Sequence, residues 1–165
     1  MKRGRFIALE GGEGTGKSTQ VKALAAELSH RGLDVVTTRE PGGTAGAEAI
    51  RDLLLSGEAD RWTPQSEALL FAAARADHVA RLIRPALARG QWVISDRYLD
   101  SSRAYQSASG LSDEDLLTLH RIGSGGLLPD CVLLLELPAE EADRRATMRD
   151  GGLSDRFGGR DGEFH

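Results

Sequence analysis

The sequence has one cysteine, few aromatic residues and no long apolar run. Because Cys131 is alone, an internal disulfide is excluded, and its place in the apolar run 131–135 predicts a buried core thiol without a redox role. The N-terminal apolar run 6–9 ends at Glu10. Four residues are too few for the apolar part of a signal peptide or for a membrane-spanning helix. We therefore expect a soluble cytoplasmic protein.

An excess of positive charge is also lacking. The net charge of −4 argues against a protein that coats nucleic acid. Hydrophobic residues make up 40% and charged residues 28%, as in ordinary globular proteins. A chain of 165 residues suits one core, so we expect residues 1–165 to form a single domain.

Short apolar runs alternate with segments of helical period. The runs 6–9, 35–38, 92–95 and 132–135 are predicted strands, and their continuous apolar character predicts helices over both faces. Helices are predicted at 17–31, at 65–89 with a kink or end at Pro85, at 112–122 and from Pro138 onward. This alternation indicates an α/β fold with a mostly parallel sheet.

Residues 11–18 match the pattern G-x-x-x-x-G-K-[ST], between a predicted strand and a predicted helix. In that setting the backbone N–H groups surround phosphates, Lys17 reaches the β and γ phosphates, and the Ser18 hydroxyl takes a place on Mg²⁺. A merely flexible turn is the alternative. The triphosphate site would comprise Gly11, Gly12, Glu13, Gly14, Thr15, Gly16, Lys17, Ser18 and Thr19.

Three further pairs of residues could complete the site. Asp96 and Arg97 follow a strand at the end where such sheets bind ligands, so Asp96 could hold the metal and Arg97 could neutralise phosphate charge. A surface ion pair is the alternative. Two pairs four residues apart could recognise a nucleotide or could be ordinary core and surface positions: Phe71 with Arg75, and Ser102 with Gln106.

Four segments together resemble the thymidylate kinase family, specifically its bacterial branch: residues 6–20, 38–44, 70–79 and 96–106. The resemblance implies a P-loop three-layer α/β/α sandwich. It also implies that Phe71 stacks on thymine, that Ser101, Ser102 and Gln106 contribute to dTMP recognition, and that Glu13 lies near the acceptor sugar. The residues implied around the acceptor phosphate are Arg51, Arg75 and Arg97.

The resemblance further implies a glycine- and arginine-containing lid at residues 149–162. Bacterial relatives supply a catalytic arginine from this lid, which makes Arg149 and Arg156 the candidates ahead of Arg160. A homodimer packed partly through the helix around residues 72–80 is implied as well. Family members continue with a helix, a strand and a closing helix, so this chain is expected to lack its last edge strand.

The expected reaction transfers the γ-phosphoryl group of ATP to dTMP, giving dTDP and ADP, with Mg²⁺ held by Ser18 and Asp96. Lys17, Arg97, Arg149 and Arg156 are the expected catalytic residues. Two alternatives stay open. One is a kinase for another nucleoside monophosphate, and the other is a nucleotide-binding fragment without catalysis.

Overall fold

Four parallel strands form the centre of the protein, whose computed structural model describes residues 3–58 and 60–150. The strands are β1 (Phe6–Glu10), β2 (Val35–Arg39), β3 (Trp92–Asp96) and β4 (Cys131–Leu134), in the order β2-β3-β1-β4. Each matches a predicted strand to within about a residue at either end. The order places β1 and β3 side by side, with Leu9 opposite Asp96.

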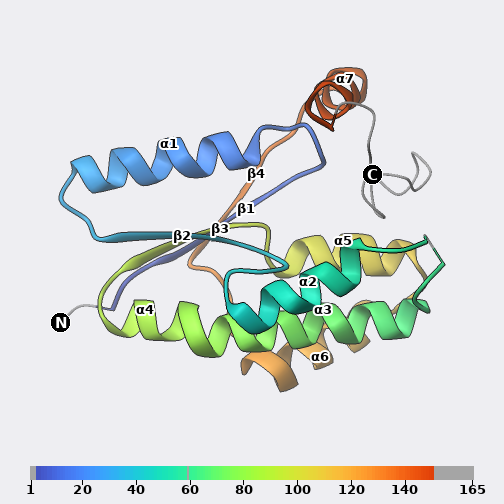
Figure 1. Ribbon diagram of the computed structural model, residues 1–165. Helices are drawn as coiled ribbons and strands as arrows, with labels where there is room; N and C mark the ends of the chain where they lie inside the picture. Colours follow the sequence, from blue (N-terminus) through green and yellow to red (C-terminus); the bar gives the residue numbers. More distant parts are fainter. Residues whose placement is uncertain (1–2, 59, 151–165) are drawn as a thin grey trace.

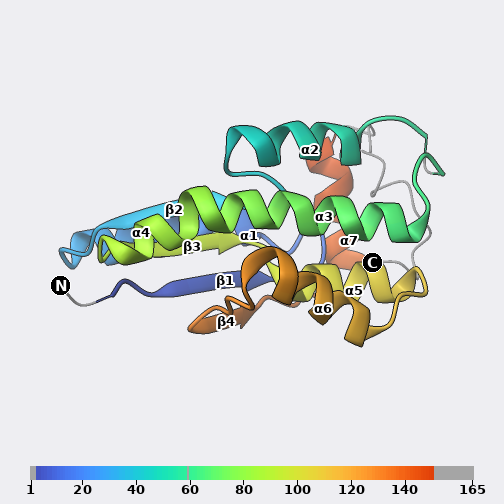
Figure 2. The same ribbon diagram turned by 90° about the horizontal axis from the view of Figure 1, so that it is seen from below.

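Helices cover both faces of the sheet, as Figure 1 shows. On one face lies α1 (Lys17–His30). The other face carries α2 (Ala45–Leu55), α3 (Pro64–His78), α4 (Arg84–Ala88), α5 (Leu99–Ala108) and α6 (Asp113–Ser124). The last described helix is α7 (Ala139–Asp150). This is the predicted three-layer α/β/α architecture, and in the second view α3 lies between α2 and α6 (Figure 2).

Local sequence determines where several helices begin. Thr44, Thr63 and Ser112 each accept a hydrogen bond from a backbone N–H in the first turn of α2, α3 and α6. Such capping supplies a partner for a donor that the helix itself leaves unpaired. Pro64 follows Thr63 at the first helical position, where its missing N–H costs nothing.

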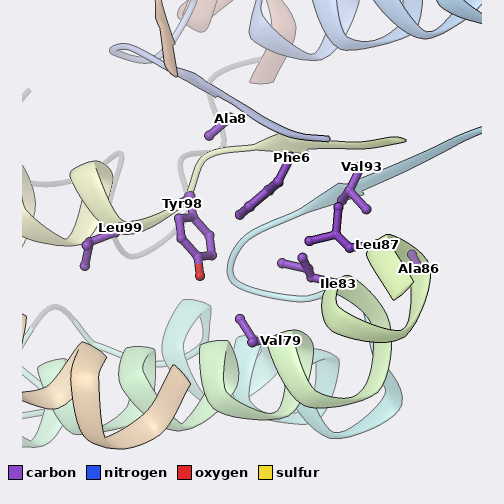
Figure 3. Close-up of a cluster of buried hydrophobic side chains, with 9 residues drawn as sticks. All are labelled: Phe6, Ala8, Val79, Ile83, Ala86, Leu87, Val93, Tyr98 and Leu99. Atoms are coloured by element: carbon purple, nitrogen blue, oxygen red, sulfur yellow. The ribbon is translucent and has the colours of Figure 1, made fainter. Parts of the chain in front are cut away.

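The main core lies between the sheet and the helices α3 to α5. Phe6 and Tyr98 meet edge to face, with ring centroids 4.8 Å apart, and Val79, Ile83 and Leu87 close the cluster from below (Figure 3). The Tyr98 hydroxyl donates to the backbone oxygen of Leu127, so its polar end is paired. A second cluster of Leu9, Val21 and Ile94 packs under α1. Tyr98 directly follows Arg97, so this core fixes the backbone on which the site is built.

Two expectations about the elements need correction. The long helix predicted at 65–89 runs through α3, a π-helical turn at Val79–Ile83 and α4 as far as Ala88, so it does not end at Pro85. Cys131 is exposed rather than buried, and so are all four residues of β4. The apolar run correctly predicts a strand there, but β4 lies at the edge of the described sheet, without helices over both of its faces.

No helix among the described residues is both long and apolar enough to cross a membrane.

Candidate active site

The loop between β1 and α1 has the backbone geometry that its glycines allow. Gly14 has φ of 71°, and a Cβ built there would lie 2.1 Å from the backbone oxygen of Ala142. Gly16 has φ of 86° and caps the N-terminus of α1. Both positions therefore select glycine. The loop leads into the N-terminus of α1, where the free backbone N–H groups favour the binding of an anion.

Lys17 is the first residue of α1, directly after this loop, and only 7% of it is exposed. Its Nζ donates to the backbone oxygen of Gly12 over 2.6 Å. Burial, followed by the nearby Arg97 guanidinium, lowers the pKa of Lys17 to about 8. A phosphate brought into the loop would favour the charged form and replace the solvation that burial removes.

Ser18 and Asp96 are brought together from opposite halves of the sequence. The Ser18 hydroxyl donates to Asp96 Oδ2 over 2.6 Å, because α1 and β3 begin and end at the same edge of the sheet. A hydroxyl and a carboxylate are oxygen ligands, which suit Mg²⁺ when nucleotide phosphates and water complete the coordination. The described residues contain no group of three or more His, Cys, Asp or Glu side chains that could hold a metal by themselves. These two side chains fit a metal bound jointly with a ligand.

Arg97 contacts both the phosphate loop and side chains of α5. Its Nη1 donates to the backbone oxygen of Gly11 over 3.0 Å and to Ser101 Oγ over 3.1 Å, and its guanidinium lies 5.3 Å from the centre of the Tyr105 ring. Its φ of 70° is positive, which is uncommon for a residue with a side chain and costs of order 1–3 kcal/mol. Such strain persists where surrounding contacts impose it.

Glu10, which the sequence reasoning did not select, supplies two of those contacts. Its carboxylate accepts from the Tyr98 backbone N–H over 2.8 Å and from the Ser101 hydroxyl over 2.5 Å. Burial raises the pKa of Glu10 despite these bonds. The sequence does contain a signal for Glu10, because an acid there ends an apolar strand immediately before a phosphate loop.

A pocket opens beside Arg97, between α2, α3 and α5. It contains every residue that the sequence analysis assigned to dTMP, together with aromatic and apolar side chains. Its lining consists of Glu13, Glu40, Pro41, Arg51, Leu55, Phe71, Arg75, Arg97, Tyr98, Ser101, Ser102, Tyr105 and Gln106. Three guanidinium groups and several aromatic rings in one pocket suit a ligand with a flat ring and an anionic group.

A buried network of charged groups lies at the base of this pocket. Glu40 accepts from Arg75 Nε over 2.7 Å and from His78 Nδ1 over 2.9 Å. The other ring nitrogen of His78 lies 2.7 Å from the Thr38 hydroxyl. Burial by itself would raise the pKa of Glu40, but Arg75 and His78 hold it below its ordinary value. Glu40 was also missed from the sequence.

Arg75 in turn reaches across to α5. Its Nη2 donates to Ser102 Oγ over 2.7 Å and to the backbone oxygen of Tyr98 over 3.2 Å. Arg51 approaches from α2, where Nη1 donates to the backbone oxygen of Pro41 over 2.8 Å. The guanidinium groups of the pocket are thus held by protein contacts and are oriented before any ligand binds.

Two predicted residues cannot be placed in this arrangement. Arg149 falls near the end of α7, where only the backbone is described, and Arg156 lies outside the described residues, as does Arg160. The proposed lid at 149–162 is therefore almost entirely outside the part of the chain that the structure describes.

Comparison with known proteins identifies relatives over nearly the whole chain. The family model for thymidylate kinase matches residues 9–165. Thymidylate kinase of Rhizorhabdus wittichii is 66% identical over 163 residues, which cover 98% of this chain and 78% of the relative. That of Caulobacter vibrioides is 52% identical over 166 aligned positions, covering 100% of this chain and 79% of the relative.

A solved structure gives the same result. The crystal structure of thymidylate kinase from Ehrlichia chaffeensis matches with a TM-score of 0.76 and 32% identity, covering 91% of this chain and 84% of that one. The phosphate loop, the adjoining pocket and these matches lead to one conclusion: the chain belongs to the thymidylate kinase family.

Proposed function

We propose that this protein is an ATP-dependent phosphotransferase that moves the γ-phosphoryl group of ATP to dTMP, giving ADP and dTDP. The observation that carries the proposal is the position of Arg97. One guanidinium contacts both the phosphate loop, through Gly11, and the aromatic pocket, through Ser101 and Tyr105. The donor and acceptor sites are therefore neighbours, with a positive charge between them.

Charge neutralisation and positioning supply most of the catalysis in this proposal. The acceptor is a phosphate that is already ionised at neutral pH, so it needs little help from a general base. Lys17 and Arg97 stabilise the charge that develops on the transferred group, and Arg149 and Arg156 add to it from the lid. Ser18 and Asp96 would hold Mg²⁺, which would supply positive charge against the donor phosphates when bound. The backbone N–H groups of the loop, residues 11–19, hold the donor phosphates.

The pocket binds the acceptor nucleotide in this proposal. Thymine stacks on Phe71, and the polar side chains of α5 contact the base and sugar: Ser101, Ser102 and Gln106. Arg51, Arg75 and Arg97 surround the phosphate, and Glu13 lies at the sugar. All of these residues line the same pocket, which supports their common role.

We also propose a single kinase domain over residues 1–165 that acts in the cytoplasm as a homodimer. Adjacent helices leave large apolar side chains exposed, with Leu69 of α3 at 56% and Ile122 of α6 at 76%. A second copy packed against these two helices would remove such side chains from water. Light scattering coupled to size exclusion should give twice the mass of the chain, and a monomer at micromolar concentration would contradict this.

A panel of acceptors tests the substrate. Release of ADP from ATP should be measured with dTMP, dUMP, AMP, GMP and CMP at equal concentrations. We expect the highest kcat/KM with dTMP. Faster turnover on a purine monophosphate would refute the assignment of the pocket.

A further inference from the structure

Two buried polar side chains, one from α3 and one from α5, pair beside the pocket. Glu67 of α3 is 2% exposed and Gln106 of α5 is 0% exposed. Gln106 Nε2 donates to Glu67 Oε1 over 3.3 Å. Gln106 also lines the pocket, and its Oε1 has no hydrogen-bond partner within the part of the chain that the structure describes.

The carboxylate determines which way the amide points. A glutamine amide has a donor end and an acceptor end, whereas a carboxylate offers only acceptors. Glu67 can therefore pair with the NH₂ end of Gln106 but not with its oxygen. Oε1 is left as a buried acceptor, and a ligand that supplies an N–H recovers the free energy that an unpaired acceptor costs.

This acceptor lines the same pocket as the ring of Phe71. Glu67, Phe71 and Arg75 are spaced four residues apart and so share one face of α3. Ser102 and Gln106 share one face of α5 by the same spacing. Glu67 pairs with Gln106, and Arg75 pairs with Ser102. On α3, Phe71 therefore lies between two residues that hydrogen-bond to α5.

We propose that Glu67 is a specificity-determining residue that acts through Gln106. By fixing the amide with Oε1 as acceptor, it selects pyrimidines that carry a hydrogen on N3, as thymine and uracil do. Cytosine presents an unprotonated N3, which would face Oε1 acceptor to acceptor. The inference rests on the proposed function, because it takes Phe71 as the stacking surface for the base of the acceptor.

Equilibrium binding tests this inference without requiring catalysis. Dissociation constants for dTMP, dUMP and dCMP should be measured by calorimetry on the unaltered protein and on Glu67→Gln. The glutamine has nearly the same shape but can donate or accept, so Gln106 loses its imposed orientation. We expect the preference for dTMP over dCMP to fall about tenfold, as for loss of one hydrogen bond, while the ratio of dTMP to dUMP stays unchanged.

Two further variants separate this role from a structural one. Glu67→Asp keeps an acceptor-only group and should retain the preference for dTMP over dCMP. In Gln106→Leu the preference should already be lost, and adding Glu67→Gln should not lower it further. If Glu67→Gln fails to fold, as judged by circular dichroism, the results for Glu67→Asp and Gln106→Leu still decide the matter.

Several outcomes would overturn the inference. These are an unaltered protein that binds dCMP as tightly as dTMP, an unchanged ratio in Glu67→Gln, and equal losses for all three nucleotides. Failure of the proposed function has a different signature. A protein that binds dTMP in preference to dCMP but transfers no phosphoryl group would refute the kinase activity while leaving the role of Glu67 intact.

Discussion

Replacing Glu40 with glutamine removes a negative charge from the base of the pocket while keeping the shape of the side chain. Glu40 and Arg75 have side chains that are each 4% exposed and pair over 2.7 Å. Removing one partner of such a buried pair leaves the other charge uncompensated, which costs about 3–5 kcal/mol. For a domain of this size, each kcal/mol lowers Tm by about 2–4 °C, so Glu40→Gln should unfold roughly 10 °C earlier.

Urea and thermal unfolding followed by circular dichroism would measure this loss. Glu27→Gln is the matched control, because Glu27 pairs with Arg31 over 2.7 Å on the exposed surface of α1. An exposed pair contributes at most about 1 kcal/mol. If Glu40→Gln destabilised the protein no more than Glu27→Gln does, the buried network would not have the energetic role given to it here.

The same substitution predicts a pH dependence. Burial would raise the pKa of Glu40, but Arg75 and His78 together lower it below the ordinary value of 4.5. A carboxylate with a lowered pKa stabilises the fold above its unfolded-state pKa, and this stabilisation is lost as pH falls through the folded-state value. The difference in unfolding free energy between the unaltered protein and Glu40→Gln should therefore be full at pH 7 and shrink in acid below about 4.5.

Three further changes test other parts of the site. Phe71→Ala should weaken dTMP binding about tenfold or more through lost stacking, with ATP binding unchanged in calorimetric titrations. Asp96→Asn removes the anionic ligand proposed for Mg²⁺ and should raise the Mg²⁺ concentration for half-maximal velocity about tenfold or more. Because burial and Arg97 lower the pKa of Lys17 to about 8, ATP affinity should fall by about tenfold per pH unit above that pH, and Lys17→Met should abolish this dependence.

Each of these three has a result that would contradict it. Equal losses of dTMP and ATP binding in Phe71→Ala would place the ring outside the acceptor site. An unchanged Mg²⁺ requirement in Asp96→Asn would move the metal elsewhere. ATP affinity that stays constant between pH 7 and pH 10, or that falls equally in Lys17→Met, would separate the titration of Lys17 from phosphate binding.

Much of the fold could be predicted because its signals are local. Continuous apolar runs gave the four strands, and the glycine-rich loop with its following amphipathic segment gave α1. Helices α2 and α5 were not among the predicted helices. Gly46 lies in the first turn of α2, and Tyr98 gives α5 no side-chain cap. The exposure of Cys131 depends on strand order, which is a property of the assembled sheet.

In the candidate site, too, residues with local sequence signals could be predicted and residues with distant partners could not. Lys17 could be predicted from a contiguous motif and Arg97 from its place at the end of a strand. The buried acids that hold other groups in place were missed, because their partners are distant in sequence. Glu10 meets Tyr98, Glu40 meets Arg75 and Glu67 meets Gln106 at separations of 88, 35 and 39 residues. No pattern within one segment contains both members of such a pair.

In the proposed reaction, a phosphoryl group moves from ATP held at Lys17 to a nucleotide in the pocket that contains Phe71. Incubation with ATP labelled at the γ-phosphate, Mg²⁺ and dTMP, followed by chromatographic separation of the products, tests it directly. We predict label in dTDP in amounts equal to the ADP formed, and no transfer by a folded Lys17→Ala variant. Label released only as inorganic phosphate, or transfer that survives in Lys17→Ala, would contradict the account.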